Sequence, residues 1–385
     1  MPGEQVYLVD LGQFLPNPPV DNDAIEAALG MVGGRPSRAK RLTLRNNGIQ
    51  SRHYALDPNT GKATHNNAQL TALAVQDALE RARWAVETLD LLVCGTSSPD
   101  QLKPAHANMV HAELGRTPLE AVTTAGVCSS GVTALKYAYL SVRSGLAQRA
   151  VSTGSELASS FMVARNFAAE SLERIEQATH RPELAFEQDF LRWMLSDGAG
   201  AALLASELVP GQLGFRIDAI DGMSLAHELP VCMYSGAIKR ADGRLQGWRD
   251  AADPMTAMRE HYFSVKQDAR LLHQHITRLV APDTIGAFMR KHQLRADDIN
   301  WFLPHQSSEY FRPVLAKALT DSGFAIEQQR WFTNLTRVGN VGSAAVYLML
   351  SELLRSGKLA RGERVLCFVP ESARFSVYFM LLTVV

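Results

Sequence analysis

Cys128 is the residue of this sequence with the clearest potential for chemistry, because it lies within a run of small residues, Thr123–Gly131. Small residues allow a sharp turn from a strand into a helix, and the dipole at a helix N-terminus favours a thiolate. A thiolate can accept an acyl group from a thioester. The alternative is a buried structural cysteine, which is the usual place of this residue type.

Two polar residues far along the chain could complete such a site. His305 follows the strand-like segment Trp301–Pro304, so its imidazole is expected on a loop at a strand end. Asn340 lies in the glycine-rich segment Gly339–Gly342, and its amide could donate a hydrogen bond to a thioester carbonyl. The alternatives are a structural histidine and an asparagine that only shapes its own turn.

An internal repeat predicts that these residues meet. Residues 126–145 and 338–357 each contain a small-residue turn, an apolar helical run and a closing Arg-Ser-Gly. Aligning the two Arg-Ser-Gly ends places Cys128 on Asn340. Chance similarity between two strand–helix units is the alternative, and a second repeat argues against it.

The second repeat pairs residues 88–98 with residues 298–308, each a short apolar strand followed by two serines. Helical patterns precede both, at Leu70–Arg83 and Asp283–His292. Alternating strands and helices predict a mostly parallel sheet with helices on both faces. Two similar halves then predict an α/β fold with five layers, α/β/α/β/α, in which reactive groups lie at the carboxyl ends of strands.

The repeat also predicts the domain organisation. We expect an N-terminal half over residues 1–206 that carries the cysteine, and a C-terminal half over residues 214–385 that carries the histidine and the asparagine. A mixed polar and aromatic segment at about 159–193 interrupts the first half and is interpreted as a helical insertion.

Composition narrows the class of protein further. The 39 basic and 39 acidic residues balance, so no nucleic-acid partner is expected. The four cysteines form no CxxC pair, which predicts reduced thiols in a cytoplasmic protein. We expect no signal peptide and no membrane span, since no apolar stretch of about eighteen residues occurs. No metal-ligand spacing or nucleotide-binding glycine motif is present, so no metal is expected.

The motifs around these residues resemble a known family. Val127–Gly131, Pro304–Gln306 and Gly339–Ser343 are similar to the three active-site motifs of β-ketoacyl-ACP synthase III. Residues 48–53 and Ser196–Ala201 resemble two further motifs, and the similarity spans nearly the whole chain in order. The resemblance implies a thiolase fold, a homodimer and a Cys-His-Asn triad. It also implies substrates carried on acyl carrier protein or coenzyme A, with no other cofactor.

In the mechanism that the resemblance implies, Cys128 attacks an acyl thioester and holds the acyl group. His305 and Asn340 then stabilise the enolate of a malonyl or β-ketoacyl thioester. The backbone N–H groups of Cys128 and of Ser372 or Ala373 are expected to hold the second oxyanion.

Three departures from the family are informative. The last loop is Pro370–Phe375 where the family has a run of glycines, so the pocket must differ. Leu42 stands where priming enzymes stack a tryptophan on coenzyme A, which favours acyl carrier protein. Leu102 and Lys103 occupy the segment that gates the acyl pocket of the partner subunit, and the lysine replaces an apolar residue there.

Residues 14–20, 33–57 and 190–201 resemble a subgroup, the ketosynthase–cyclases that make dialkylresorcinols and cyclohexanediones. Those enzymes join two acyl chains and then close a ring. Glu156 and Arg374 are candidate accessory residues for proton transfer or β-keto recognition, with a structural ion pair as the alternative. A basic patch for acyl carrier protein is expected from four residues, with a solvated face as the alternative: Arg38, Arg41, Arg259 and Lys266.

We therefore predict a ketosynthase that joins an acyl chain on Cys128 to a β-ketoacyl or malonyl thioester and then closes a ring. Three alternatives stay open at this point. These are decarboxylative priming of fatty acid synthesis, acyl transfer to an oxygen or nitrogen nucleophile, and a degenerate subunit that only scaffolds a partner.

Overall fold

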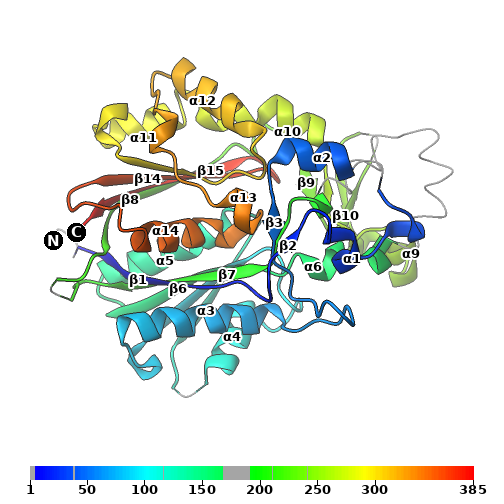
Figure 1. Cartoon of the computed structure of the whole chain (residues 1–385), viewed down its shortest axis with the longest axis horizontal. Helices are drawn as coiled ribbons and strands as arrows, with labels where there is room; N and C mark the ends of the chain where they lie inside the picture. The colour runs from blue at the N-terminus through cyan, green and yellow to red at the C-terminus, as the bar shows by residue number, and fades with distance from the viewer. Residues whose placement is uncertain (1–4, 38–39, 116, 168–190, 210, 241) are drawn as a thin grey trace.

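The computed structural model describes residues 5–37, 40–115, 117–167, 191–209, 211–240 and 242–385. Five layers follow one another in the order helices, sheet, helices, sheet, helices (Figure 1). This architecture confirms the predicted fold. Among the described residues, no helix combines the length and the apolar character needed to cross a membrane.

The first sheet carries the strands of the N-terminal part of the chain. Its spatial order is β5 (Glu120–Ala125), β4 (Leu91–Thr96), β6 (Arg149–Glu156), β7 (Gly198–Ala205) and β1 (Tyr7–Phe14). The three strands β5, β4 and β6 are parallel, whereas β7 and β1 pair antiparallel. All eight residues of β7 are buried, as expected for a strand covered by helices on both faces.

The second sheet repeats this order. Its strands are β13 (Trp301–Pro304), β14 (Arg364–Glu371), β15 (Ser376–Val384) and β8 (Phe215–Ser224). A single parallel bridge between Phe302 and Trp331 lies where the first sheet has β5. The strands β8 and β1 pair at one end and join the two sheets. The matching strand order agrees with the internal repeat, and the chain passes from β7 to β8 between residues 205 and 215.

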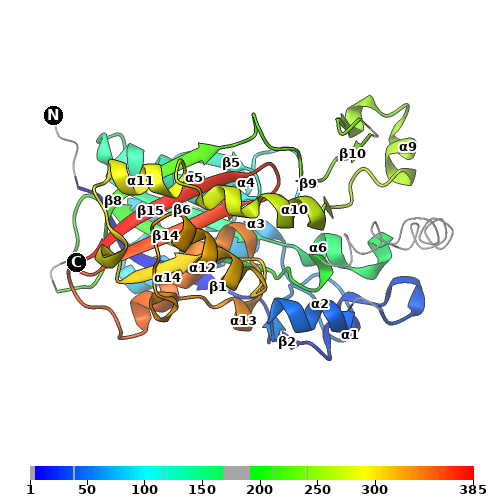
Figure 2. The same ribbon diagram turned by 90° about the horizontal axis from the view of Figure 1, so that it is seen from above.

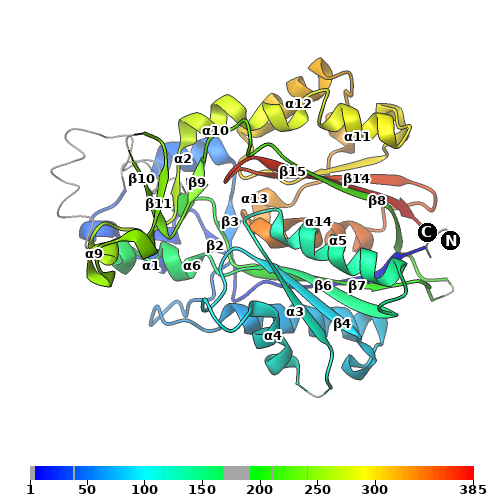
Figure 3. The same cartoon turned by 180° about the vertical axis from the view of Figure 1, so that it is seen from behind.

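The helices form the remaining three layers (Figures 1 and 3). The outer layer of the first sheet has α3 (Asn67–Ala82) and α4 (His106–Leu114); the central layer has α5 (Ser130–Arg143) and α14 (Ala345–Arg355); the outer layer of the second sheet has α10 (Ala269–His275), α11 (Ile285–Lys291) and α12 (Phe311–Asp321). The helices predicted at Leu70–Arg83 and Asp283–His292 are thereby confirmed as α3 and α11.

The two halves meet closely where α5 begins. A Cβ added to Gly131 would lie 2.3 Å from the carbonyl oxygen of Ser343, so only glycine allows this approach. Tyr347 of α14 donates its hydroxyl to the Gly131 carbonyl at 2.8 Å, and its hydroxyl lies 2.7 Å from that of Ser152. These contacts bring the loop before α5 and the loop before α14 to the same place.

One end of the molecule is built from shorter elements (Figure 2). Residues 225–268, which we call the cap, leave the second sheet after β8 and return before α10. The cap contains β9 (Met233–Tyr234), β10 (Ala237–Lys239), β11 (Leu245–Gly247), α9 (Pro254–Arg259) and β12 (Lys266–Gln267). Beside it lie β2 (Val20–Asp21), α1 (Ile25–Leu29), α2 (Lys40–Asn47), β3 (Ser51–Arg52), α6 (Ser159–Met162) and α13 (Leu335–Val338).

The predicted insertion at about 159–193 is described only in part. Its start forms α6 and a short 3-10 turn at Ala164–Phe167. The helical patterns expected within 168–190 lie outside the described residues.

Candidate active site

Cys128 lies in the tight turn between β5 and α5, as the small residues around it predict. Gly126 has φ 149°, and the N–H and hydroxyl of Ser130 both donate to the carbonyl of Val127, at 3.1 and 2.8 Å. Ser129 is the N-cap residue of α5, so Cys128 directly precedes the helix. The cysteine is partly accessible from the cavities described below.

His305 directly follows β13, at the carboxyl end of that strand. Its backbone N–H donates to the carbonyl of Phe368 on β14 at 2.8 Å, which ties the residue to the sheet. The side chain is buried, and burial lowers the pKa of the imidazole to about 4. The ring is therefore neutral at pH 7, with one nitrogen able to donate and the other able to accept.

Asn340 lies in the turn between α13 and α14. Its backbone N–H donates to the carbonyl of Met194, and its carbonyl accepts from the N–H of Ser196, both at 2.9 Å. In the side chain, Oδ1 accepts from the N–H of Gly342 at 3.0 Å. The amide NH₂ is thus left as the group of this side chain that can donate to a ligand.

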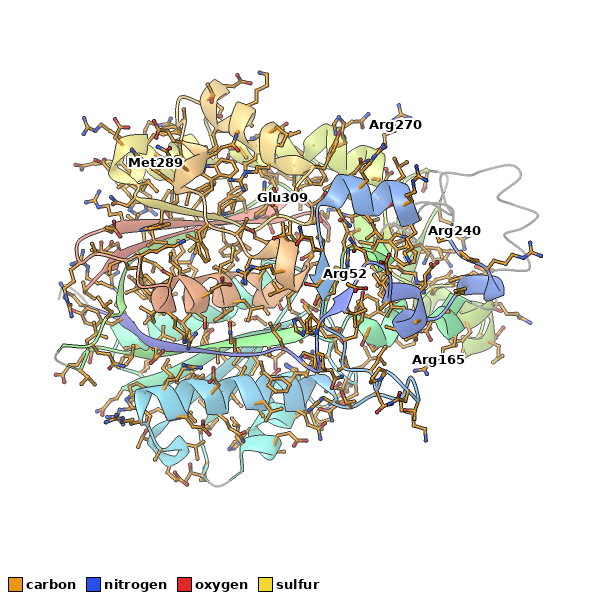
Figure 4. All side chains as sticks on the ribbon, viewed as in Figure 1. Arg52, Arg165, Arg240, Arg270, Met289 and Glu309 are labelled. Carbon is orange, nitrogen blue, oxygen red and sulfur yellow. The ribbon has the colours of Figure 1, made fainter. Side chains whose placement is uncertain are left out.

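Arg52 supports the turn that carries Asn340. Figure 4 shows Arg52 inside the molecule, and its guanidinium donates from Nε to the carbonyl of Trp193 at 3.0 Å. Gly339 has φ 75°, and a Cβ there would lie 2.9 Å from side-chain atoms of Arg52 and of Ser196. A buried arginine and a glycine therefore shape the turn together.

The three predicted residues share cavity walls in pairs. Cys128 and His305 line a cavity under α10 and α12, which we call the inner cavity. Cys128 and Asn340 line a larger cavity that extends to the cap, which we call the outer cavity. His305 and Asn340 both line a third, smaller space. The structure thus brings Cys128 together with His305 and Asn340, which lie 177 (305 − 128) and 212 (340 − 128) positions further along the chain, whereas their catalytic roles stay a prediction.

The electrostatic surroundings of Cys128 differ from expectation. Burial raises the pKa of the thiol, and the carboxyl groups of Glu371 and Glu156 raise it further. The prediction that the start of α5 would favour a thiolate is therefore wrong for the protein without substrate. At neutral pH Cys128 is a thiol, and its proton must leave while the acyl group is being transferred.

Glu156, the last residue of β6, lies in the wall of the outer cavity. One carboxylate oxygen accepts from the N–H groups of Ser97 and Ser343, at 3.3 and 3.1 Å. The other accepts from the hydroxyls of Ser97 and Ser98, at 2.6 and 2.8 Å. Burial raises its pKa, and the hydrogen bonds oppose that rise. Glu156 therefore connects the loop after β4 with the loop that carries Asn340, and its part in proton transfer stays a prediction.

The turn between β14 and β15 corrects two predictions. The N–H of Ala373 donates to the carboxylate of Glu371, so Ala373 is not free to hold an oxyanion. Ser372 does line both cavities together with Cys128. Arg374 is exposed and donates to the carbonyl of Ala226, and neither cavity wall includes it.

The predicted gate residues are both at the surface of the single chain. Leu102 is 75% exposed and lies at the edge of the outer cavity, and Lys103 is also exposed. Their reach into a partner subunit is untested.

The predicted basic patch does not form one surface. Lys266 turns its ammonium group toward the carbonyls of Ser264 and His261 inside the cap, so it holds that loop together. Arg41 on α2 and Arg259 on α9 lie at opposite edges of this end of the molecule, as Figure 2 shows for their helices. Arg38 lies outside the described residues. Two other arginines, Arg240 and Arg270, extend outward at the same end (Figure 4).

Two residues of this region were not singled out from the sequence. Gln267 of β12 is buried, lines the outer cavity and donates to the hydroxyl of Ser372 at 3.1 Å. Glu371 is buried at the end of β14. The one available signal for Glu371 was that it replaces a glycine of the family's last loop, and Gln267 carries no local signal.

Comparison with known proteins agrees with this description. Residues 56–188 match the family described as thiolase, N-terminal domain, and residues 289–369 match the family described as 3-oxoacyl-[acyl-carrier-protein (ACP)] synthase III, C terminal. The β-ketoacyl-[acyl-carrier-protein] synthase III of Gloeobacter violaceus is 28% identical over 297 residues, which are 77% of this chain and 78% of that protein.

Solved structures with the same fold include OleA of Xanthomonas campestris, which was solved with lauric acid and lauroyl-CoA bound. It has a TM-score of 0.74 at 20% identity and covers 99% of each chain. The tetronic acid condensing enzyme AbyA1 has a TM-score of 0.73 at 23% identity, over 98% of this chain and 99% of its own. The fold is therefore that of the thiolases. Within them, the chain is similar over most of its length to β-ketoacyl-[acyl-carrier-protein] synthase III proteins.

Proposed function

We propose that the protein is an acyltransferase of the ketosynthase type that joins two acyl chains and then closes a ring to a cyclohexanedione- or resorcinol-type product. The observation that carries this proposal is that two separate cavities meet at Cys128. An enzyme that only attached a two-carbon unit would need one apolar cavity for a chain beside a passage for the phosphopantetheine arm, whereas both cavities here have apolar walls. Two cavities at one nucleophile favour two chains.

Both cavities have walls that suit alkyl chains. The inner cavity is lined by apolar residues of α10, α12, β14 and the turn after α10: Leu272, Ile276, Val280, Phe311, Val314, Leu315 and Phe368. The outer cavity has apolar residues of the cap and of the region around α6: Phe161, Leu191, Met194, Met233, Phe263 and Val265. Burial of each CH₂ group contributes about 0.8 kcal/mol, so such walls favour alkyl chains over polar groups.

The proposed reaction begins when the sulfur of Cys128 attacks an acyl thioester. The carrier thiol leaves with the proton of Cys128. A malonyl thioester that loses CO₂, or a β-ketoacyl thioester whose α-proton passes to the carboxylate of Glu156, then forms an enolate, to which neutral His305 and Asn340 donate hydrogen bonds. The enolate carbon attacks the acyl carbonyl, and the Cys128 sulfur is the leaving group. A second enolate carbon within this product then attacks the remaining carrier thioester, so that the ring closes and the carrier thiol leaves.

We place both substrates on phosphopantetheine arms, either of acyl carrier protein or of coenzyme A, and no resident cofactor takes part in these steps. None of the four cysteines, all of which the structure describes, forms a disulfide, which fits a cytoplasmic enzyme that uses a thiol. The arginines at the cap end could attract an acidic carrier.

Product analysis tests the proposed function. The enzyme is mixed with an acyl-carrier thioester and a β-ketoacyl thioester of different chain lengths, and the products are identified by mass spectrometry. A cyclic product that contains both chains supports the proposal. A linear β-ketoacyl product that contains one chain, or an ester or amide, contradicts it.

If each cavity binds one acyl chain, narrowing one cavity should change the preferred length of that chain only. Val314→Trp narrows the inner cavity and Val265→Trp narrows the outer one, so each should shorten the chain accepted on its own side. We expect a loss of about 10-fold or more in kcat/KM for the long-chain substrate of that side, since several CH₂ groups lose their binding site. Competition between substrates of graded length measures this. Identical shifts in both variants would argue against two chain sites.

A homodimer is the proposed assembly. Strand β5 is an edge of the sheet, and the exposed side of α5 next to it carries Tyr137 and Leu140, the latter 51% exposed. An open edge with adjacent apolar side chains is a surface that proteins usually cover.

Leu140→Glu is therefore expected to convert the dimer to a monomer, because it buries a charge in the interface. Sedimentation velocity measures the change. Met255→Glu on α9 is the matched control, since Met255 is an exposed apolar residue at the cap end. A Leu140→Glu protein that stays dimeric contradicts this interface.

A further inference from the structure

The turn after β14 is held by a buried carboxylate. Glu371 is only 7% exposed, and its side chain accepts from the N–H of Ala373 and, at 3.1 Å, from the hydroxyl of Ser376. It thus bridges the two ends of the turn between β14 and β15. Pro370 precedes it and restricts the backbone on the other side.

The same turn is tied to the cap. The carbonyl of Ala373 accepts from the N–H groups of Cys232 and Met233, at 2.8 and 3.1 Å. The hydroxyl of Ser372 accepts from the side chain of Gln267 at 3.1 Å. Since Met233 and Gln267 both line the outer cavity, the turn connects the wall of that cavity with Cys128.

Ser372 is the member of the turn that reaches the reaction centre. It lines the inner cavity and the outer cavity, and Cys128 and Ser307 are the other residues common to both walls. The N–H of its neighbour Ala373 is occupied by Glu371. Among the residues of the turn, Ser372 is therefore the candidate whose backbone N–H could donate to an acyl group on Cys128.

We propose that Glu371 is a positioning residue for acyl transfer: its carboxylate fixes the turn so that the backbone of Ser372 faces the acyl group on Cys128. The hydrogen bonds from Ala373 and Ser376 to this carboxylate hold the backbone of the turn between β14 and β15 in one conformation. This proposal depends on one part of the proposed function, the attachment of an acyl group to Cys128. It does not depend on which product forms afterwards.

The charge of Glu371 gives a second, independent readout. After burial, the carboxyl of Glu371 is the largest cause that raises the pKa of the Cys128 thiol, ahead of Glu156. The titratable side chains in the two cavity walls besides Cys128 are Glu156, His305 and Tyr234, and Glu371 lies behind the walls. Removing the charge of Glu371 should therefore make the thiol lose its proton at lower pH. A residue that only packed would leave that titration unchanged.

The test compares Glu371→Gln and Glu371→Ala with wild type and with Glu80→Gln, a change on the exposed face of α3. The full-length enzyme is mixed with an acyl-CoA, and acyl attachment to Cys128 is followed by intact-protein mass. Iodoacetamide alkylation of Cys128 as a function of pH reports on the thiol without any substrate.

Glutamine keeps an acceptor for the N–H of Ala373, so Glu371→Gln should acylate within a few-fold of wild type. Glu371→Ala frees the turn and should acylate about 10- to 100-fold more slowly, because the oxyanion loses a placed donor. Both should shift the alkylation midpoint of Cys128 to lower pH, by about half a unit or more. Glu80→Gln should behave as wild type.

Equal acylation rates for Glu371→Ala and wild type would overturn the proposal, as would an unshifted alkylation midpoint in Glu371→Gln. If Glu371→Ala does not fold, the alkylation profile of Glu371→Gln still decides. A failure of the proposed function has a different signature. In that case wild type forms no two-chain product, while acylation and alkylation of Cys128 still respond to Glu371.

Discussion

Cys128→Ala is expected to eliminate the attachment of acyl groups and to lower product formation by about four orders of magnitude or more. The reason is that both cavities meet at this thiol, so another residue cannot take its place with the same access. Intact-protein mass after incubation with acyl thioesters measures the attachment. Product analysis under the same conditions measures turnover.

Cys232→Ser is the matched control for this experiment. Cys232 is a buried cysteine of the cap, and its sulfur lies 3.3 Å from the carbonyl of Asp268. This variant should acquire the acyl group as wild type does. Full activity of Cys128→Ala would instead support a protein that only scaffolds a partner.

His305→Ala is expected to separate the two half-reactions. The acyl group should still attach to Cys128, because attack on the thioester does not need the enolate donor. Carbon–carbon bond formation should fall about 10²- to 10³-fold, since one donor to the enolate oxygen is lost. Single-turnover experiments with pre-acylated enzyme measure the second step alone. His227→Ala, at an exposed position, is the control.

The pH dependence of the second step follows from the same residue. Burial lowers the pKa of His305 from an ordinary value of 6.5 to about 4, so the imidazole stays neutral as the pH falls from 8 to 5. Protonation of His305 should therefore not reduce the condensation rate in that range and should matter only near pH 4. A loss centred near pH 6.5 that disappears in His305→Ala would show that the imidazole titrates as an exposed histidine does.

Several parts of the structure could be predicted because they depend on local patterns. The apolar run of α3 has buried residues on one face, and Asn66 before it accepts from the N–H of Gln69 as a helix cap. The small residues around Cys128 and the glycines around Asn340 gave two similar turns. Aligning the two repeated segments, 126–145 and 338–357, then predicted that Cys128 and Asn340 lie close together.

Other parts depend on contacts between distant segments and could not be read from such patterns. Glu371 has a raised pKa because the fold buries it, and that burial comes from packing of the turn against the cap. The prediction for Arg374 failed for the same reason. The turn directs the side chain of Arg374 toward the carbonyl of Ala226 and away from the cavities. The position of a residue along the turn decides whether its side chain faces a cavity or the solvent, and the sequence does not show that position.

The sequence by itself indicated the two repeated halves, the order of strands and helices, and a candidate nucleophile with two polar residues expected beside it. Each of these follows from periodicity and from small residues at turns, which act over a few positions. Only the tertiary structure decided that two cavities meet at Cys128, that carboxylates surround the thiol and that the basic residues are dispersed. The cavities are the spaces that packing of distant segments leaves empty, and the positions of the charged groups depend on the same packing. No local sequence pattern specifies either property.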